Sequence, residues 1–469
     1  MTNSAEQNLV ALLASEQRGL RRVLVAGIAV LVLLVVMSGA LGVYYYLASQ
    51  QLTQASLQLQ QQAFDTRRRV DQQANRTATQ ERRMRRIYDE IRQSINSVAG
   101  AAADNPDAAL AAARGFLQHG RHLSLAQERL FAQVSAPNGR APAALKALLT
   151  GVVALSESDQ RGETVGAGGN ELPPRLAAAR VAFLQADADP TLHPLAQAGM
   201  AWVLYQIASS DRRNFRADTC RDVLTAVQES IENNDPGPQP LWYRAQCERR
   251  TGHTMRAFAD FARAIHGTSE VLADPDDADD AEVTVAMNAF NGAGATLTAA
   301  SSINDPDIQA GLVVARERCV GANDPLVHDP NLQIALACIN QAVALRRVLR
   351  QTENQVGQTR QSIGFVYLRE HNYEAAYKNA ASVEATGLYA QNELVRALAG
   401  AHYRPSATSK QTSVSADVAE ARRNIGMFRF GQFNVCELQA LLPPDLYTEA
   451  QQIFAATVQP GTDTLCQKR

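Results

Sequence analysis

The longest uninterrupted hydrophobic stretch of the chain covers residues 23–47 and contains no charged residue. A helix rises about 1.5 Å per residue, and about 20 apolar residues cross the hydrocarbon core of a bilayer. The pattern therefore predicts a single transmembrane helix at residues 23–47, preceded by a polar tail at residues 1–22.

Residues 48–99 contain neither Pro nor Gly and are rich in Gln, Arg and Ala, a composition that favours one long helix. A seven-residue spacing of mostly apolar positions predicts a helical stalk that forms a weak coiled coil or rests on another helix of the chain. The spaced positions are Ala63, Val70, Thr77, Met84, Ile91 and Val98.

Beyond residue 100, Ala-rich amphipathic segments alternate with turns, and the alternating pattern typical of strands is nearly absent. Many turns carry Asp or Asn followed by Pro, which is typical of a helix start because the side chain caps the first turn. The turns at residues 189, 235, 274 and 305 are spaced like two-helix repeats. The turns with Asp or Asn before Pro are Asn105-Pro106, Asp189-Pro190, Asp235-Pro236, Asp274-Pro275, Asp305-Pro306, Asp324-Pro325 and Asp329-Pro330.

Two segments carry small residues where paired helices approach closely, with large apolar residues around them. The first has Leu241, Ala245, Gly252, Ala257, Phe261 and Ala264, and the second has Ile363, Gly364, Tyr367, Tyr373, Ala376 and Ala380. This pattern resembles the tetratricopeptide repeat, a helix–turn–helix unit of about 34 residues. The resemblance is clear over about residues 238–265 and 358–384, and looser around 193–226 and 388–403. Tyr373 fits the large residue that opens the second helix, whereas His253 and Thr254 fill that place poorly.

The resemblance implies an all-α fold in which an irregular α-solenoid follows the membrane helix and the stalk. The predicted domains are a cytoplasmic tail at 1–22, a transmembrane helix at 23–47, a stalk at 48–99 and a helical segment at 100–190. Tetratricopeptide-like repeats are predicted at 191–403, and a C-terminal helical cap at 404–469 with a helix near 446–457. Residues 156–171, 273–282 and 404–415 are predicted to be loops.

Charge around the hydrophobic run predicts its orientation. Arg18, Arg21 and Arg22 precede the run, and no Lys or Arg follows it until Arg67. By the positive-inside rule, the large C-terminal part is exported, and we expect a bacterial inner-membrane protein with a periplasmic C-terminal domain. A cleaved signal peptide is the alternative, because Ser38 and Ala40 offer a cleavage site. The net charge of −2 gives no reason to expect a nucleic-acid partner.

The chain contains six cysteines, and an even number on the exported side favours disulfides. Six cysteines allow 15 pairings, so the sequence leaves the connectivity open. Pairing of neighbours along the chain is our expectation, because two such pairs span a turn between predicted helices. The expected pairs are Cys220–Cys247, Cys319–Cys338 and Cys436–Cys466.

Three segments could suggest a cofactor or a metal site, but none of them matches the sequence pattern of a known site of that kind. The Gly-rich residues 165–170 lack the spacing of a dinucleotide fingerprint, and the acidic residues 274–280 lack the central Gly and final Glu of a calcium loop. His119 and His122 have no carboxylate nearby in the sequence. We therefore expect no cofactor and no metal, and since no nucleophile–base motif is present, the chain is not expected to be an enzyme.

In the tetratricopeptide family, the first helix of each pair lines a concave groove that holds peptides. The resemblance carries this role onto Trp242, Gln246, Arg249 and Arg250 in one unit, and onto Gln361, Phe365 and Arg369 in the other. An aromatic ring beside arginines suits a carboxylate. The alternative is that Trp242 packs in the core and the arginines are solvated.

These expectations favour a membrane-anchored periplasmic scaffold or assembly factor of a cell-envelope complex. Its partners would be other envelope or membrane proteins, with self-association through residues 48–99. Two alternatives remain open: an envelope enzyme that uses residues 100–190 or 404–469, and a module that binds peptidoglycan or another glycan. The aromatic content of 6 % gives little support to a glycan platform.

Overall fold

The structure is a computed structural model, and the part of the chain that it describes lies within one compact unit, Ala74–Arg469. It describes residues 105–457 apart from 139, 164, 166–171, 210–216, 232–235, 274, 276–277, 300–305, 321–328, 352, 385–389, 428–437 and 440. The predicted tail at 1–22, membrane helix at 23–47 and stalk at 48–99 lie outside the described residues.

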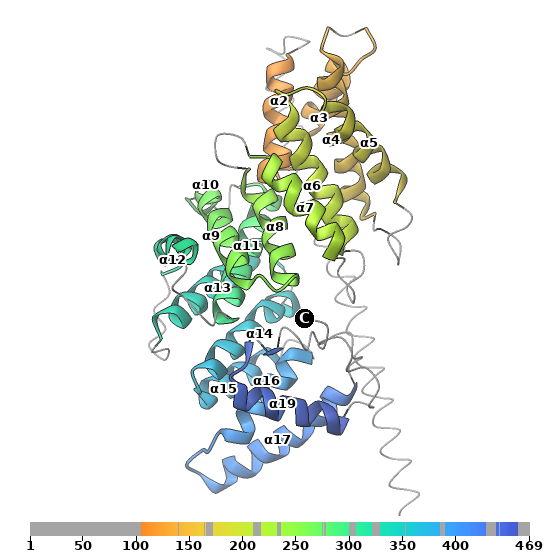
Figure 1. Cartoon of the computed structure of the whole chain (residues 1–469). Helices are drawn as coiled ribbons and strands as arrows, with labels where there is room; N and C mark the ends of the chain where they lie inside the picture. The colour runs from red at the N-terminus through yellow and green to blue at the C-terminus, as the bar shows by residue number, and fades with distance from the viewer. Residues whose placement is uncertain are drawn as a thin grey trace, which may run out of the picture. The chain divides into compact units, whose positions relative to one another are not determined.

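Helices make up all the regular structure of the described residues, which confirms the all-α class (Figure 1). The first helices along the chain are α2 (Pro106–Arg114), the π-helix η1 (Gly115–His119), α3 (Leu125–Val134), α4 (Ala143–Arg161), α5 (Pro174–Ala186), α6 (His193–Ser209) and α7 (Ala217–Glu229). Next come α8 (Pro238–Arg250), α9 (Thr254–Gly267), α10 (Ser269–Ala273), α11 (Asp280–Ala299), α12 (Pro306–Cys319) and α13 (Pro330–Val348). The last are α14 (Glu353–Arg369), α15 (Tyr373–Glu384), α16 (Ala390–His402), α17 (Thr408–Met427) and α19 (Pro444–Thr457).

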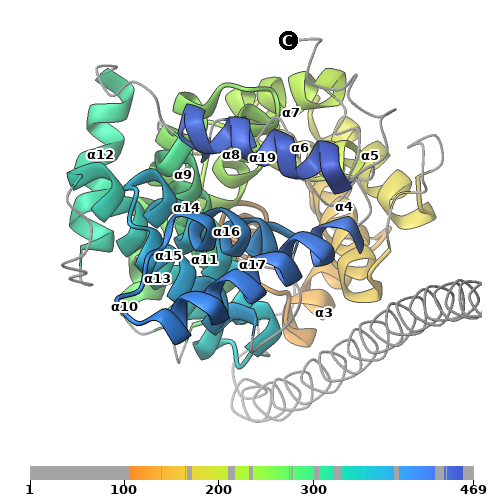
Figure 2. The same ribbon diagram turned by 90° about the horizontal axis from the view of Figure 1, so that it is seen from below.

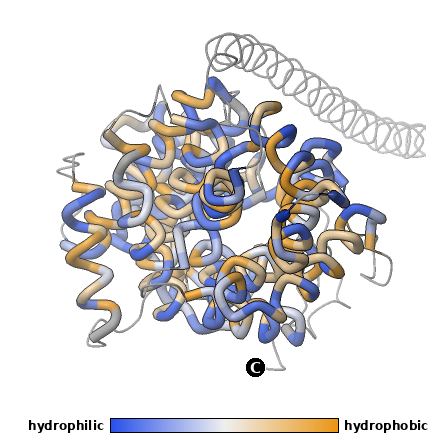
Figure 3. Tube along the Cα trace, turned by 90° about the horizontal axis from the view of Figure 1, so that it is seen from above, coloured by the Kyte–Doolittle hydropathy of each residue, from blue (hydrophilic) through white to orange (hydrophobic). Residues whose placement is uncertain are grey.

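The predicted membrane span is corrected. Within residues 105–457, as far as they are described, no helix is both long enough and apolar enough to cross a bilayer. The prediction depended on one uncharged run, residues 23–47, which lies outside the described residues, whereas the described helices mix polar and apolar positions. Figure 3 shows hydrophobic and hydrophilic residues interleaved along them. Over the described residues the fold class is therefore all-α without a transmembrane helix, and the predicted inner-membrane, periplasmic localisation is corrected to the extent that no membrane-spanning helix among them supports it.

The helices are arranged as successive pairs, and the first helix of each pair contacts the first helix of the next. The pairs are α4 with α5, α6 with α7, α8 with α9, α11 with α13, α14 with α15, and α16 with α17. We call the series α4, α6, α8, α11, α14 and α16 the first-helix row, because each member contacts the following one. This arrangement is that of a helical-repeat array, in which each unit packs on its neighbours.

One unit departs from a regular two-helix repeat. Helix α12 is inserted between α11 and α13 and packs on α9 and α13, and it lies at the edge of the described part in Figures 1 and 2. The helix that begins at Pro306 is therefore an extra helix rather than the start of a new pair. The C-terminal helix α19, predicted near 446–457, contacts α16 and α17.

Two predicted helix starts are confirmed by their caps. The Asn105 side chain accepts a hydrogen bond from the amide of Ala108 at 3.0 Å, and α2 begins at Pro106. Asp329 caps α13 in the same way. Asp189-Pro190 instead forms a turn before α6, and α8 and α11 begin after their Pro residues. The predicted loop at 404–415 is confirmed only for residues 404–407, because α17 begins at Thr408.

Two hydrophobic cores are built from these pairs, and α8 contributes to both. Leu241 and Ala245 belong to the core that continues toward α19, whereas Tyr243 and Cys247 belong to the core of α2 to α7. Trp242 packs against both cores. Successive residues of one helix thus join two otherwise separate apolar clusters.

Helices α4, α5 and α6 approach closely because the large Phe183 side chain packs against glycines, which have no side chain to displace it. A Cβ atom at Gly199 of α6 would lie 2.5 Å from the ring of Phe183 in α5, and one at Gly151 of α4 would lie 2.8 Å from it. Phe183 is fully buried between these two first helices. Phe261 of α9 occupies the same kind of position against Gly292 of α11.

The four described cysteines form two disulfides, in the pairs that neighbour pairing predicts. Cys220 of α7 is bonded to Cys247 of α8, with Cα atoms 5.3 Å apart. Cys319 of α12 is bonded to Cys338 of α13, with Cα atoms 4.7 Å apart. The expected Cys436–Cys466 pair lies outside the described residues.

Replacing the buried ring should destabilise the array far more than replacing its exposed neighbour. We expect Phe183→Ala to lower the free energy of unfolding by about 3–5 kcal/mol, because it leaves a cavity between α4 and α6. Leu184 is 56 % exposed, so Leu184→Ala should change it by less than about 0.5 kcal/mol. Urea unfolding followed by circular dichroism measures both, and equal effects would contradict the assigned packing.

Loss of the disulfide between α7 and α8 should also be measurable. The bond closes a loop with a sequence separation of 27 residues, and such a cross-link stabilises by about 2–4 kcal/mol. We expect the double variant Cys220→Ala/Cys247→Ala to unfold at a correspondingly lower urea concentration. An unchanged midpoint would mean that the bond adds nothing to stability.

Candidate partner-binding face

Three of the predicted groove residues lie along one face of α8. Trp242, Gln246 and Arg249 follow each other at intervals of four and three residues, which places them on neighbouring turns. Each is half-buried. Pro238 stands in the first turn of α8, after Gly237 with a φ of 84°. A side chain at Gly237 would overlap the Gln118 backbone, so this glycine lets η1 approach the start of the helix.

The indole of Trp242 forms the apolar end of this face. Its ring lies 5.2 Å from the ring of Tyr205 in α6 and 5.2 Å from that of Tyr243, measured between centroids. The indole Nε1 is buried and has no hydrogen-bond partner among the described residues. Trp242 is therefore packed against the core on one side while its N–H donor is left without an acceptor.

The arginines form the polar end. Arg249 Nη2 donates a hydrogen bond to Gln246 Oε1 at 3.1 Å, and Arg249 Nε is buried without a partner within the described part of the chain. The charges of Arg249 and Arg250 act on the hydroxyl of Tyr205, which places both near that tyrosine. We call Tyr205, Trp242, Gln246, Arg249 and Arg250 the Trp242 face.

Burial controls the ionisation of the two tyrosines behind the tryptophan. Loss of solvent raises the pKa of Tyr205 to about 12, although the nearby Arg249 and Arg250 oppose the shift. Burial also raises the pKa of Tyr243, whose hydroxyl accepts a hydrogen bond from Gln239 Nε2 at 2.5 Å. Both phenols therefore stay neutral at physiological pH, and the rings act as a rigid apolar support.

The aromatic support continues into the N-terminal helices. Tyr205 stacks on Tyr243 at 4.7 Å, Tyr243 lies 6.1 Å from Trp202, and Trp202 stacks on Phe116 of η1 at 4.9 Å. The Trp242 face is thus backed by rings from η1, α6 and α8. Such contacts add to burial and hold the indole in one orientation.

The predicted residues of the second unit do not form an equivalent face. Phe365 is 2 % exposed and belongs to the core, so its assignment to a groove is wrong. It is covered because α14 packs against α11, α13, α15 and α16. Gln361 and Arg369 are half-buried, and burial lowers the pKa of Arg369. Helix α11 lies between α8 and α14 in the first-helix row. The predicted groove residues of α8 and those of α14 therefore do not form one continuous surface.

The segments considered for metal binding instead pair with one another. His122 Nδ1 lies 2.7 Å from Asp279 Oδ1, and Arg121 Nε lies 2.8 Å from Glu282 Oε1. This hydrogen bond and this ion pair join the loop after η1 to the start of α11. Across the described residues, no group of three or more His, Cys, Asp or Glu side chains is placed to hold a metal ion. The Gly-rich residues 166–170 lie outside the described residues.

Sequence reasoning missed Tyr205, which the structure brings into contact with Trp242. The only signal was its position in residues 193–226, where the repeat pattern is loose. Contact between α6 and α8 in the first-helix row brings the two rings together, and that contact is not encoded locally.

No family model, curated protein or solved structure matches this chain at a significant level. The structure thus defines the class, an all-α array of paired helices, and the function must be argued from its surface.

Ionisation of Tyr205 offers a test of its burial. Below pH 10 the phenol is neutral in both the folded and unfolded chain, so it leaves stability unchanged. Between about pH 10 and 12 the unfolded chain loses this proton while the folded chain keeps it, so the free energy of unfolding falls. We expect this fall to be shallower in Tyr205→Phe, measured by urea unfolding at several pH values. An identical slope in both proteins would contradict the burial of the hydroxyl.

Proposed function

We propose that this protein is a scaffold that binds another protein along its first-helix row, with the Trp242 face as the main contact. The closer likeness to tetratricopeptide repeats is part of this proposal. Two segments carry the family's pattern of small and large residues, and both fold as helix–turn–helix pairs, α8 with α9 and α14 with α15. Tyr373 opens α15 and stacks on His402, which supports its expected packing role.

The observation that supports the proposal most is the pair of buried N–H donors on one face of α8. Trp242 Nε1 and Arg249 Nε have no acceptor within the described part of the chain. A buried donor without an acceptor costs about 1–3 kcal/mol. The Arg249 side chain is half-buried, so its guanidinium can turn outward to a partner's carbonyl or carboxylate oxygen and recover that energy. Tryptophan, tyrosine and arginine are also the residues that most often dominate binding energy at protein interfaces.

The position of the face in the array supports the same conclusion. It lies on α6 and α8, which contact each other, so its residues are held by two helices rather than by a loop. Cys247 follows Gln246 and bonds α8 to α7. A contact surface that is fixed before binding loses little conformational entropy when the partner arrives.

The proposal is tested by reversing the charge of the two arginines. A photo-crosslinking residue at position 246 of the full-length protein, followed by mass spectrometry, would identify the partner. We then expect Arg249→Glu/Arg250→Glu to bind the purified partner at least about tenfold more weakly, because two attractive charges become repulsive. Binding is measured by isothermal titration calorimetry.

The matched control is Arg256→Glu/Arg316→Glu, which makes the same change in net charge at two exposed arginines of α9 and α12. We expect this variant to bind like the unchanged protein. If both double variants bind the partner as tightly as the unchanged protein, the Trp242 face is not the binding surface. Loss in both would point to a general charge effect.

A further inference from the structure

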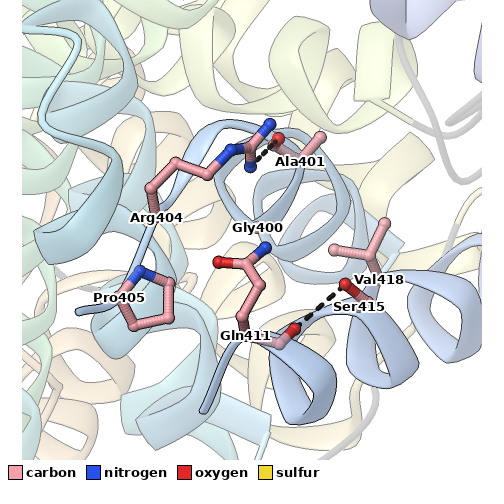
Figure 4. A pocket seen from close by; sticks show the side chains of 7 residues that line it. All are labelled: Gly400, Ala401, Arg404, Pro405, Gln411, Ser415 and Val418. Carbon is pink, nitrogen blue, oxygen red and sulfur yellow. Dashed lines mark hydrogen bonds between the residues drawn. The ribbon is translucent and has the colours of Figure 1, made fainter. Parts of the chain in front are cut away.

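A second site lies between α16 and α17, away from the Trp242 face. A shallow cavity of about 530 Å³, more open to solvent than enclosed, is lined by residues from the end of α16, the connecting segment and α17 (Figure 4). Its volume falls in the range of about 300–1,000 Å³ that is typical of small-molecule sites. The lining residues are Gly400, Ala401, Arg404, Pro405, Gln411, Ser415 and Val418.

Arg404 is the one charged residue of this lining, and its side chain is exposed, with hydrogen bonds from the guanidinium to two backbone carbonyls. Arg404 Nη1 donates to the carbonyl oxygens of Ala401 at 2.6 Å and Tyr403 at 3.2 Å. These contacts occupy one nitrogen and leave the edge formed by Nε and Nη2. That edge carries two parallel N–H groups, which match the two oxygens of a carboxylate.

Two polar groups of α17 complete the lining. Gln411 and Ser415 are one turn apart, and the Ser415 hydroxyl donates to the Gln411 carbonyl oxygen at 3.0 Å. Its oxygen keeps lone pairs that can accept a hydrogen bond. The side-chain amide of Gln411 extends between α17 and Arg404 in Figure 4. Val418, Ala401 and Pro405 supply the apolar surface.

The helices behind the cavity are held by close packing and by an ion pair between Arg396 and Asp417. A Cβ atom at Gly400 would lie 2.5 Å from Val418 Cγ2, so α16 and α17 touch at the cavity floor. Next to Val418, Asp417 accepts a hydrogen bond from the Tyr377 hydroxyl and lies 3.4 Å from Arg396 Nη2. Arg396 itself is 4 % exposed. The apolar part of the site, at Gly400 and Val418, is therefore fixed before binding, which lowers the cost of binding, whereas the exposed Arg404 and Ser415 side chains are ordered by the ligand.

We propose that this cavity binds a small organic carboxylate, with the carboxylate on the Nε–Nη2 edge of Arg404 and the apolar body of the ligand against Val418 and Pro405. A single cation in the lining suits a monoanion rather than a phosphate dianion. Gln411 and Ser415 would contact polar atoms of the same ligand. This site is independent of the Trp242 face.

The test uses the full-length protein and four probes: benzoate, valerate, N-acetyl-Val-Leu with a free carboxylate, and the same dipeptide as its amide. Binding is followed by saturation-transfer NMR. We expect the acids to bind with a dissociation constant of about 1 mM and the amide to show no binding. Arg404→Gln should weaken binding of the acids about tenfold or more, because a charge-assisted pair of hydrogen bonds is lost.

The matched control is Arg423→Gln, which removes an exposed arginine of α17 that does not line the cavity. We expect it to bind the acids like the unchanged protein. If Arg404→Gln loses its helical circular-dichroism signal, Gln411→Leu tests the same site and should weaken binding about threefold. Binding of benzoate and valerate would identify free acids as the ligand, and binding of the dipeptide acid alone would identify a peptide end.

Three results would overturn the proposal. They are the absence of binding by every acid, equal binding of the dipeptide and its amide, and affinity that is unchanged in Arg404→Gln and Gln411→Leu.

Discussion

Close contact between a buried phenylalanine and glycines of the neighbouring helices is the interaction on which the array depends. Phe183 fills the space between Gly151 and Gly199, which sets how closely α4 and α6 approach. Phe261 of α9, two units later, packs in a similar way against Gly292 of α11. Each ring belongs to the second helix of a pair. It sets the distance between the first helix of that pair and the first helix of the next pair. The first-helix row, and with it every surface that the row presents, follows from this packing.

The two candidate sites, the Trp242 face and the α16–α17 cavity, depend on different contacts of the helix array. The Trp242 face depends on contact between two first helices, since Tyr205 of α6 supports Trp242 of α8. The α16–α17 cavity lies within one pair, and its walls depend on the contact between Gly400 and Val418. A surface shared between units suits an extended partner, whereas a hollow within one unit suits a compact ligand.

The sequence predicted what is encoded locally. Asn105 and Asp329 cap helices because an Asx side chain before Pro satisfies the first amides, and both segments with small residues fold as helix pairs. It could not predict that α12 interrupts a pair, since Asp305-Pro306 looks like any other helix start. It also placed Phe365 in a groove, because α14 is apolar on more than one side and its periodicity does not say which side is covered. The contact of Tyr205 with Trp242 joins different units, and no local pattern reports it.

The division of α8 between two apolar cores has a mechanical consequence. Leu241 and Ala245 anchor one side of the helix, Tyr243 and Cys247 anchor the other, and the Trp242 ring touches both. Turning α8 about its axis would therefore strain both halves of the array at once. A displacement of α8 is therefore transmitted to both hydrophobic cores, and this helix mechanically couples the N-terminal half of the array to the C-terminal half.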